Sequence, residues 1–177
     1  MYEKRAADSE SISPRTVKAL RELTEKEAEL FLKACTTAVS CSYAGDRQLF
    51  LVSQEITNAD KEYSAFLSEI AKLQMAGLIA PERTLEIKHG KWFNILNNKE
   101  RCVKFWFRWI GEGKSPTILL KYYPFTEAGE ELRSLLDYEV DLRFAGIVYF
   151  RMRQHYGKGF EFDYIESVPR NGGYLVV

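Results

Sequence analysis

Two stretches decide the fold of this chain: YSAFLSEIAKLQMAGLI at residues 63–79 and YYPFTEAGEELRSLL at residues 122–136. The first has apolar residues at helical spacing and ends at Gly77, a residue that suits the left-handed position after a helix. The second reads as a strand that runs into Thr126, a favoured helix N-cap. This order of elements predicts a mixed α+β fold.

Two helices are expected ahead of these stretches. Ser13 followed by Pro14 marks the start of a short helix. Thr24 and Glu27 form a capping-box pattern, which opens an amphipathic helix of about 17 residues that we expect to reach position 39. Because residues 1–12 are polar and charged, we expect a flexible N-terminal segment followed by a single domain over residues 13–177.

The rest of the chain predicts strands around one further helix. Strands are expected at residues 48–52 and 92–96, and over 103–110 and 116–123, with another at 85–88. Residues 139–155 fit either a helix or a buried strand, and we favour the helix. Alternation at 160–164 and the turn before 174–177 predict a terminal hairpin.

Charge is balanced over the whole chain but not along it. The 25 basic and 25 acidic residues cancel, so the protein as a whole has no field that attracts nucleic acid. Residues 83–123, however, carry nine basic and three acidic residues. This basic segment also contains all three tryptophans.

Cations interleaved with aromatic rings are typical of nucleic-acid surfaces, where they neutralise phosphates and stack on bases. The alternative is a solvated outer face of a sheet, on which lysine stems cover the rings. The candidate nucleic-acid-binding residues are Lys88, Lys91, Trp92, Lys104, Trp106 and Arg108.

Other chemical motifs in the sequence favour structural interpretations. The stretch 111–115 (GEGKS) resembles the end of a phosphate-binding loop, but Pro116 and a predicted strand follow where the motif needs a helix, so we expect a hairpin turn. Glu86 and Lys88 leave a metal-dependent nuclease as a remote alternative. Cys35 and Cys41, both expected on one helix, lack zinc-ligand spacing, and Cys35 fits a small core residue. We therefore expect no catalytic residue, metal or cofactor.

Compartment and membrane association follow from simple counts. Three cysteines are an odd number for a disulfide framework, and no signal peptide opens the chain. The longest apolar run, residues 144–150, is far short of a membrane span. These features predict a cytoplasmic protein without membrane contact.

The two opening stretches resemble winged helix-turn-helix regulators. The pattern Ser-x-x-Leu-x-x-Leu-x-x-x-Gly-Leu-Ile, which marks the recognition helix in that family, is matched by Ser64, Leu67, Ile70, Gly77, Leu78 and Ile79. The pattern Leu-Thr-x-x-Gly after the wing is matched by Phe125, Thr126 and Gly129. The resemblance implies a winged-helix-like core whose wing is enlarged into an antiparallel sheet of three or four strands. The helix start, residues 60–63 (DKEY), departs from DNA readers in being acidic.

A second resemblance begins near the N-terminus. Residues 13–34 are similar to the opening of a C-terminal module in an uncharacterised bacterial family, a domain of unknown function. The matching residues are Ser13, Arg15, Thr16, Leu20, Leu23, Glu27, Ala28 and Phe31. With the later elements, the likeness covers residues 13–137. It implies a fold and no activity.

Together these observations predict a non-enzymatic bacterial binding module that mediates protein–protein contact or self-association. The alternative is nucleic-acid binding through the basic, tryptophan-rich wing at residues 83–123. DNA binding through the helix at 63–79 is disfavoured by its acidic start.

Overall fold

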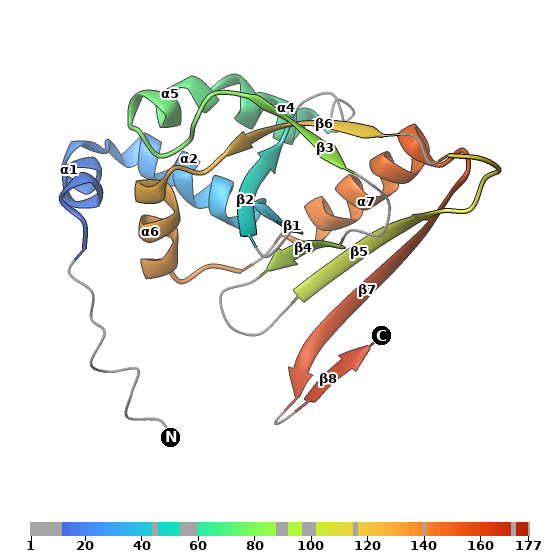
Figure 1. Cartoon of the computed structure of the whole chain (residues 1–177). Coiled ribbons are helices and arrows are strands. Elements are labelled where there is room, and N and C mark those ends of the chain that lie inside the picture. The colour runs from blue at the N-terminus through green and yellow to red at the C-terminus, as the bar shows by residue number, and fades with distance from the viewer. Residues whose placement is uncertain are drawn as a thin grey trace.

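A computed structural model describes residues 12–43, 46–53, 60–87, 92–96, 102–114, 117–139, 141–170 and 173–176 of the chain. Its helices are α1 (Pro14–Glu22), α2 (Glu25–Thr36), α4 (Lys61–Ser68), α5 (Ile70–Met75), α6 (Glu127–Leu135) and α7 (Leu142–Tyr156). Its strands are β1 (Val39–Tyr43), β2 (Asp46–Val52), β3 (Arg83–Ile87), β4 (Trp92–Leu96), β5 (Cys102–Trp109), β6 (Ile118–Pro124), β7 (Phe160–Arg170) and β8 (Gly173–Val176). The mixed α+β class is confirmed (Figure 1).

The described strands form a single antiparallel sheet in the order β3-β6-β2-β1-β4-β5-β7-β8. The four strands expected in the wing are all present, but they do not lie together. The β1–β2 hairpin separates β3 and β6 from β4 and β5. The basic segment 83–123 is therefore divided between two parts of the sheet.

The predicted caps are confirmed, because each depends only on local sequence. Ser13 caps α1, with Pro14 in the first turn, and Thr24 with Glu27 makes the full capping box of α2. Thr126 accepts a hydrogen bond from the backbone N–H of Gly129 at the start of α6. Gly77, after α5, has a φ of 72°, in the left-handed region that favours glycine.

The helix that was expected to reach position 39 is shorter than predicted. α2 ends at Thr36, not near position 39, because the hydroxyls of Thr36 and Thr37 both donate to the carbonyl of Lys33 and the chain leaves the helix. Cys41 consequently lies in β1, a strand that the sequence did not reveal.

The stretch 63–79 does not form one continuous helix. It divides at Glu69, whose φ of −99° and ψ of 2° fall outside the helical region, so α4 and α5 are separate short helices. The first of them begins after Asp60, whose side chain accepts a hydrogen bond from the N–H of Tyr63 at 2.8 Å and caps α4.

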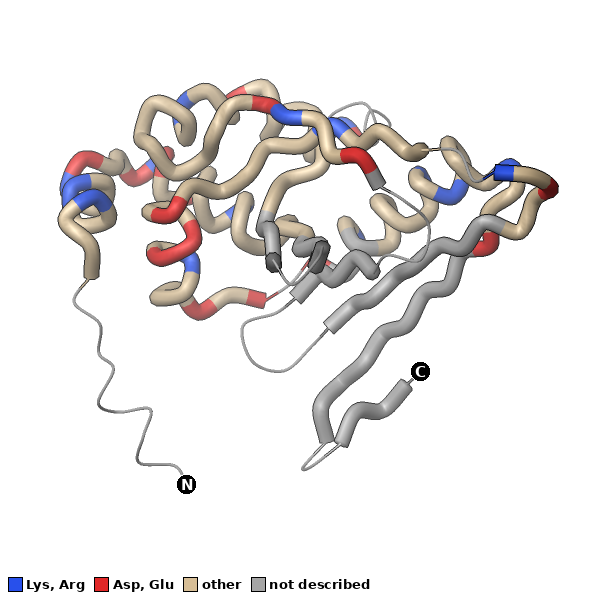
Figure 2. The backbone as a smooth tube through the Cα atoms, viewed as in Figure 1, with Lys and Arg blue, Asp and Glu red and all other residues tan. Residues whose placement is uncertain are grey.

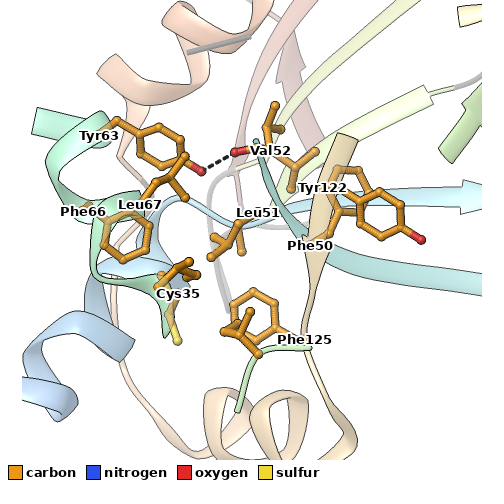
Figure 3. Close-up of a cluster of buried hydrophobic side chains, with 14 of the residues drawn as sticks. Cys35, Phe50, Leu51, Val52, Tyr63, Phe66, Leu67, Tyr122 and Phe125 are labelled. Carbon is orange, nitrogen blue, oxygen red and sulfur yellow. Dashed lines mark hydrogen bonds between the residues drawn. The ribbon is translucent and has the colours of Figure 1, made fainter. Parts of the chain in front are cut away.

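The core lies where α2, α4 and α5 pack on β2 and β6. Figure 3 shows Cys35, Phe66 and Leu67 from the helices facing Leu51 and Phe125, with Phe50 beside Tyr122. The buried hydroxyl of Tyr63 donates to the carbonyl of Val52 at 2.9 Å (Figure 3). That bond satisfies a polar group that burial would otherwise leave without a partner.

The ambiguous segment before β7 is helical, as expected. α7 runs between the β6 part of the sheet and the strands β5 and β7 (Figure 1), and the hydroxyl of Tyr156 donates to the carbonyl of Leu119 at 2.9 Å.

Within the described ranges, no helix combines the length and the apolar content that crossing a bilayer requires.

Candidate functional site

Four of the six candidate nucleic-acid-binding residues lie on two neighbouring strands. Trp92 is in β4, and Lys104, Trp106 and Arg108 are alternate positions of β5. The register places Trp92 directly opposite Trp106, so the four positions belong to one face of the β4–β5 pair. Lys88 and Lys91 lie outside the described residues.

The next strand brings acidic positions to the same face. In the β5–β7 register, Arg108 is opposite Glu161 and Trp106 is opposite Asp163. One of these pairs, Arg108 and Glu161, joins positions whose residues have opposite charges. The basic character of the segment 83–123 is therefore diluted by β7, and the rest of its charge lies elsewhere in the sheet.

The loop that resembles the end of a phosphate-binding site forms a turn, with Gly113 at a φ of 77°. No helix follows it, because β6 comes next. The expected hairpin is wrong, however, since β5 and β6 are not neighbours in the sheet. The N–H groups of Ile110 and Gly111 donate instead to the carbonyl of Gly159, at 2.8 and 3.2 Å, and so join this turn to the one between α7 and β7.

The described residues also form a groove of about 480 Å³ between α1 and the junction of α5 and α6. α1 contributes a wall of charged residues around Ala19, while the other side comes from residues 75–77 and 126–128. Figure 1 shows α1 and α6 side by side at this end of the molecule. Two contacts between elements and one exposed side chain give the groove its shape.

The first feature is the close approach of α6 to the turn after α5. The hydroxyl of Thr126 donates to the carbonyl of Gly77 at 2.6 Å, and its N–H donates to the carbonyl of Leu78 at 3.0 Å. A Cβ atom on Gly129 would stand 2.1 Å from the oxygen of Leu78. Only glycine at position 129 allows α6 to begin this close to the turn.

The second feature is a carboxylate clamp that fastens α1 to α6. Glu131 accepts hydrogen bonds from the N–H and the hydroxyl of Ser13, at 2.7 and 2.6 Å, and from the hydroxyl of buried Thr16. The hydrogen bond from the Ser13 hydroxyl, followed by that from Thr16, lowers the pKa of Glu131. The carboxylate therefore stays ionised and holds the groove wall in place.

Met75 is the most exposed large apolar side chain among the described residues, at 80%. It lies at the end of α5, off the buried stripe formed by Phe66, Ile70 and Leu73. A flexible, polarizable thioether at a groove suits contact with another apolar surface.

The described residues offer little for catalysis. Cys35 is buried, and burial raises the pKa of its thiol to about 12, so the thiolate nucleophile is scarce at neutral pH. No group of three or more histidine, cysteine or acidic side chains among the described residues is placed to hold a metal ion. Glu86 lies on β3, and its expected partner Lys88 is outside the described residues.

Sequence reasoning missed the groove because its residues come from three distant segments. The available signals were Met75, which does not fit the apolar stripe of its helix, and the paired cap residues Gly77 and Thr126. Each signal was interpreted as a local feature. Their proximity depends on β3 and β6 pairing in the sheet, which no local pattern reports.

Comparisons with curated proteins and with solved structures each gave no match. A family model described as "Protein of unknown function (DUF2806)" matches residues 3–148. The match covers most of the chain, including every residue of the groove, and confirms the expected likeness to a family of unknown function. On this match, the chain belongs to the DUF2806 family.

Proposed function

We propose that this protein is a non-enzymatic binding module that receives a segment of a partner protein in the groove between α1, α5 and α6. The observation that carries the proposal is Met75, which is 80% exposed at a groove of about 480 Å³. Exposed apolar side chains beside a concave surface are typical of protein-binding sites.

The charges around the groove support a peptide over a polyanion. Arg15 and Lys18 on α1 are accompanied by Glu22 on the same helix and by Glu127 at the start of α6. A phosphate backbone would meet both signs, whereas a peptide can place either charge opposite its complement. The odd cysteine count supports a reducing compartment, and we place this module in the bacterial cytoplasm.

The topology supports a winged-helix-like core used for protein contact. β3, β6 and β2 are consecutive in the sheet, and α4 and α5 lie between β2 and β3 in the chain, as in the winged-helix order of elements. The exposed Lys61 and Glu62 at the start of α4 have opposite charges. A helix face with both charges is better suited to contact with a protein than to contact with the phosphates of a nucleic acid.

Selection of a random dodecapeptide display library on the purified protein tests the groove. We expect enriched sequences that no longer bind a Met75→Asp variant, which should fold because the side chain is exposed. Ile110→Asp, a matched change at an exposed apolar residue in the β5–β6 turn, should leave them bound. The groove proposal would be contradicted if the enriched peptides bind Met75→Asp as well as they bind wild type, or if no peptide is enriched. Sedimentation of both variants shows whether the occupant is a second copy of the chain.

Nucleic-acid binding is the second candidate, favoured by the shared face of Trp92, Lys104, Trp106 and Arg108. It predicts that a labelled single-stranded or duplex 20-mer binds at low salt. Affinity should then fall linearly with salt on logarithmic axes, with a slope that counts the phosphates contacted. A Lys104→Glu and Arg108→Glu double variant should reduce that slope. If the protein retains neither probe at low salt, nucleic-acid binding is rejected.

A further inference from the structure

α7 has two faces of different character. Phe144, Val148 and Met152 recur every four residues and are buried against the core. The neighbouring face carries Arg143, Ile147 and Arg151, with Gly146 and Phe150 beside them. These five residues follow helical spacing of three and four, so they form one continuous surface.

A cleft of about 320 Å³ lies along that second face. Its other wall is Asp60, the residue that caps α4. Phe150 borders the cleft and is 61% exposed, although it is a large aromatic side chain. The groove at Met75 shares no residue with this cleft, so the two surfaces can be tested separately.

The two arginines of the cleft differ in how they are engaged. Arg143 donates to Asp60 at 3.0 Å and to Glu62 at 3.4 Å, so its charge is balanced by carboxylates of α4. Arg151 donates to the neutral side chain of Gln154 at 2.7 Å. A guanidinium has five N–H donors, and a neutral amide leaves its charge uncompensated.

The local sequence adds to this positive charge. Residues 142–160 contain Arg143, Arg151, Arg153 and Lys158 and no acidic residue. In Figure 2 the tube of α7 carries blue and no red. Arg153 and Lys158 are exposed, so the end of α7 presents a cationic surface beside an exposed aromatic ring, and the first acidic residue after it is Glu161 at the start of β7.

We propose that this cleft is a second docking site, which binds an acidic peptide segment through one bulky apolar side chain against Ile147 and Phe150 and one carboxylate on Arg151. Charge complementarity with the end of α7 selects an acidic partner. A nucleic acid fits less well, because its phosphates recur along the whole strand and some would face Asp60 on the opposite wall, whereas a peptide can keep its carboxylate at Arg151. The partner class is therefore an acidic, partly apolar protein segment.

Gly146 provides a variant that fills the cleft without disturbing the fold. A Cβ atom at this position meets nothing within 4 Å, and glycine is a poor residue in a helix interior. Gly146→Leu should therefore keep or raise the unfolding midpoint while it occupies the space of the incoming side chain. Arg151→Glu tests the charge, and Arg21→Glu, the same reversal at an exposed arginine in the last turn of α1 that lines neither the groove nor the cleft, is its matched control.

In the experiment, a random dodecapeptide display library is first depleted of peptides that bind the Gly146→Leu variant. The remaining peptides are then selected for binding to the wild-type protein. Recovered peptides are synthesised with and without Asp and Glu replaced by Asn and Gln, and binding is measured by fluorescence anisotropy. We expect acidic sequences with a Leu, Phe or Trp anchor. Their affinity should fall at least about tenfold on Gly146→Leu, on Arg151→Glu and on amide replacement, and should not change on Arg21→Glu.

Three results would overturn the proposal. The counter-selection could yield no sequence, or only sequences that lack acidic residues. Arg21→Glu could weaken binding as much as Arg151→Glu, which would indicate general charge attraction. A labelled single-stranded 20-mer could bind wild type and lose affinity on Gly146→Leu, which would assign the cleft to nucleic acid.

Discussion

Two helical glycines should respond in opposite ways to the same substitution. Gly129→Ala puts a methyl group 2.1 Å from the backbone oxygen of Leu78, so we expect a loss of about 2 kcal/mol or more in the free energy of unfolding. Gly146→Ala meets open space and should gain about 0.5–1 kcal/mol from the better helix former. Urea unfolding of the two variants measures both changes. A neutral Gly129→Ala would show that α6 can move away from the turn.

The thiol of Cys35 should be unreactive while the protein is folded. With a pKa raised to about 12 by burial, its thiolate fraction at pH 8 is about one in ten thousand. Iodoacetamide should label Cys35 slowly in the native protein and quickly in denaturing guanidinium, as measured by mass spectrometry of its peptide. Rapid native labelling would show that the α2 core opens.

At the scale of single residues, the sequence predicted the features that depend on near neighbours. Ser13, Thr24 and Thr126 all cap helices as their types and positions suggested. It did not predict Gly129 as a close-packing site, because the group that it approaches lies on a turn some fifty residues earlier in the chain.

Between elements, the attachment of α1 to α6 should depend on pH through Glu131. Its folded pKa is lowered from the ordinary 4.5 by hydrogen bonds from Ser13 and Thr16. The stabilising contribution is therefore fully present above pH 4.5, and is lost as pH falls through the folded pKa. Glu131→Gln should lower the thermal midpoint at pH 7, and its difference from wild type should shrink in acid. A difference that does not vary between pH 7 and 3 would contradict the clamp.

Variants at the contact between α4 and α7 distinguish the contribution of the α4 N-cap to stability from that of the ion pair. Asp60→Ala removes both the N-cap of α4 and the pair with Arg143, and the cap alone is worth about 1 kcal/mol. Arg143→Ala leaves the cap and removes this pair together with the one to Glu62, and because this arginine is largely exposed we expect a loss below about 1 kcal/mol. Asp60→Asn, which retains a capping side chain, should resemble Arg143→Ala in urea unfolding. If Asp60→Asn costs as much as Asp60→Ala, the charge matters more than the cap.

Element boundaries were predicted where the sequence contains a stop signal. α5 ends before Gly77 as expected, whereas α2 has no glycine or proline at its end, and its helical pattern continues into β1. The break at Glu69 has no sequence signal of its own.

For the whole molecule, the strands after α7 should be required for folding. A chain that ends at Val148 loses buried Met152 and all of β7, which pairs with β5 at eight positions. We expect this truncation to aggregate, because β5 becomes an open edge. A chain that ends at Arg170 keeps β7 and serves as the control. Gel filtration and circular dichroism compare the two, and a soluble, cooperatively unfolding 1–148 fragment would show that β7 is dispensable.

Sheet order was the largest feature that the sequence could not predict. Alternation identified β4, β5 and β6 as strands, but it carries no information about which strands pair. The order places the β1–β2 hairpin inside what sequence proximity suggested was one wing. For the same reason, the sequence could place four of the candidate wing residues in one segment. It could not show that the acidic positions 161 and 163 pair with that segment.

The separation of β5 from its partner β7 also has a consequence during synthesis. β5 ends at Trp109 and β7 begins at Phe160, so at about 5–20 residues per second the ribosome needs several seconds to supply the missing neighbour. Throughout that interval the nascent chain exposes one unpaired side of an aromatic strand. Slowing translation across residues 110–160 should therefore increase the dependence of this protein on chaperones, more than slowing it across 1–40.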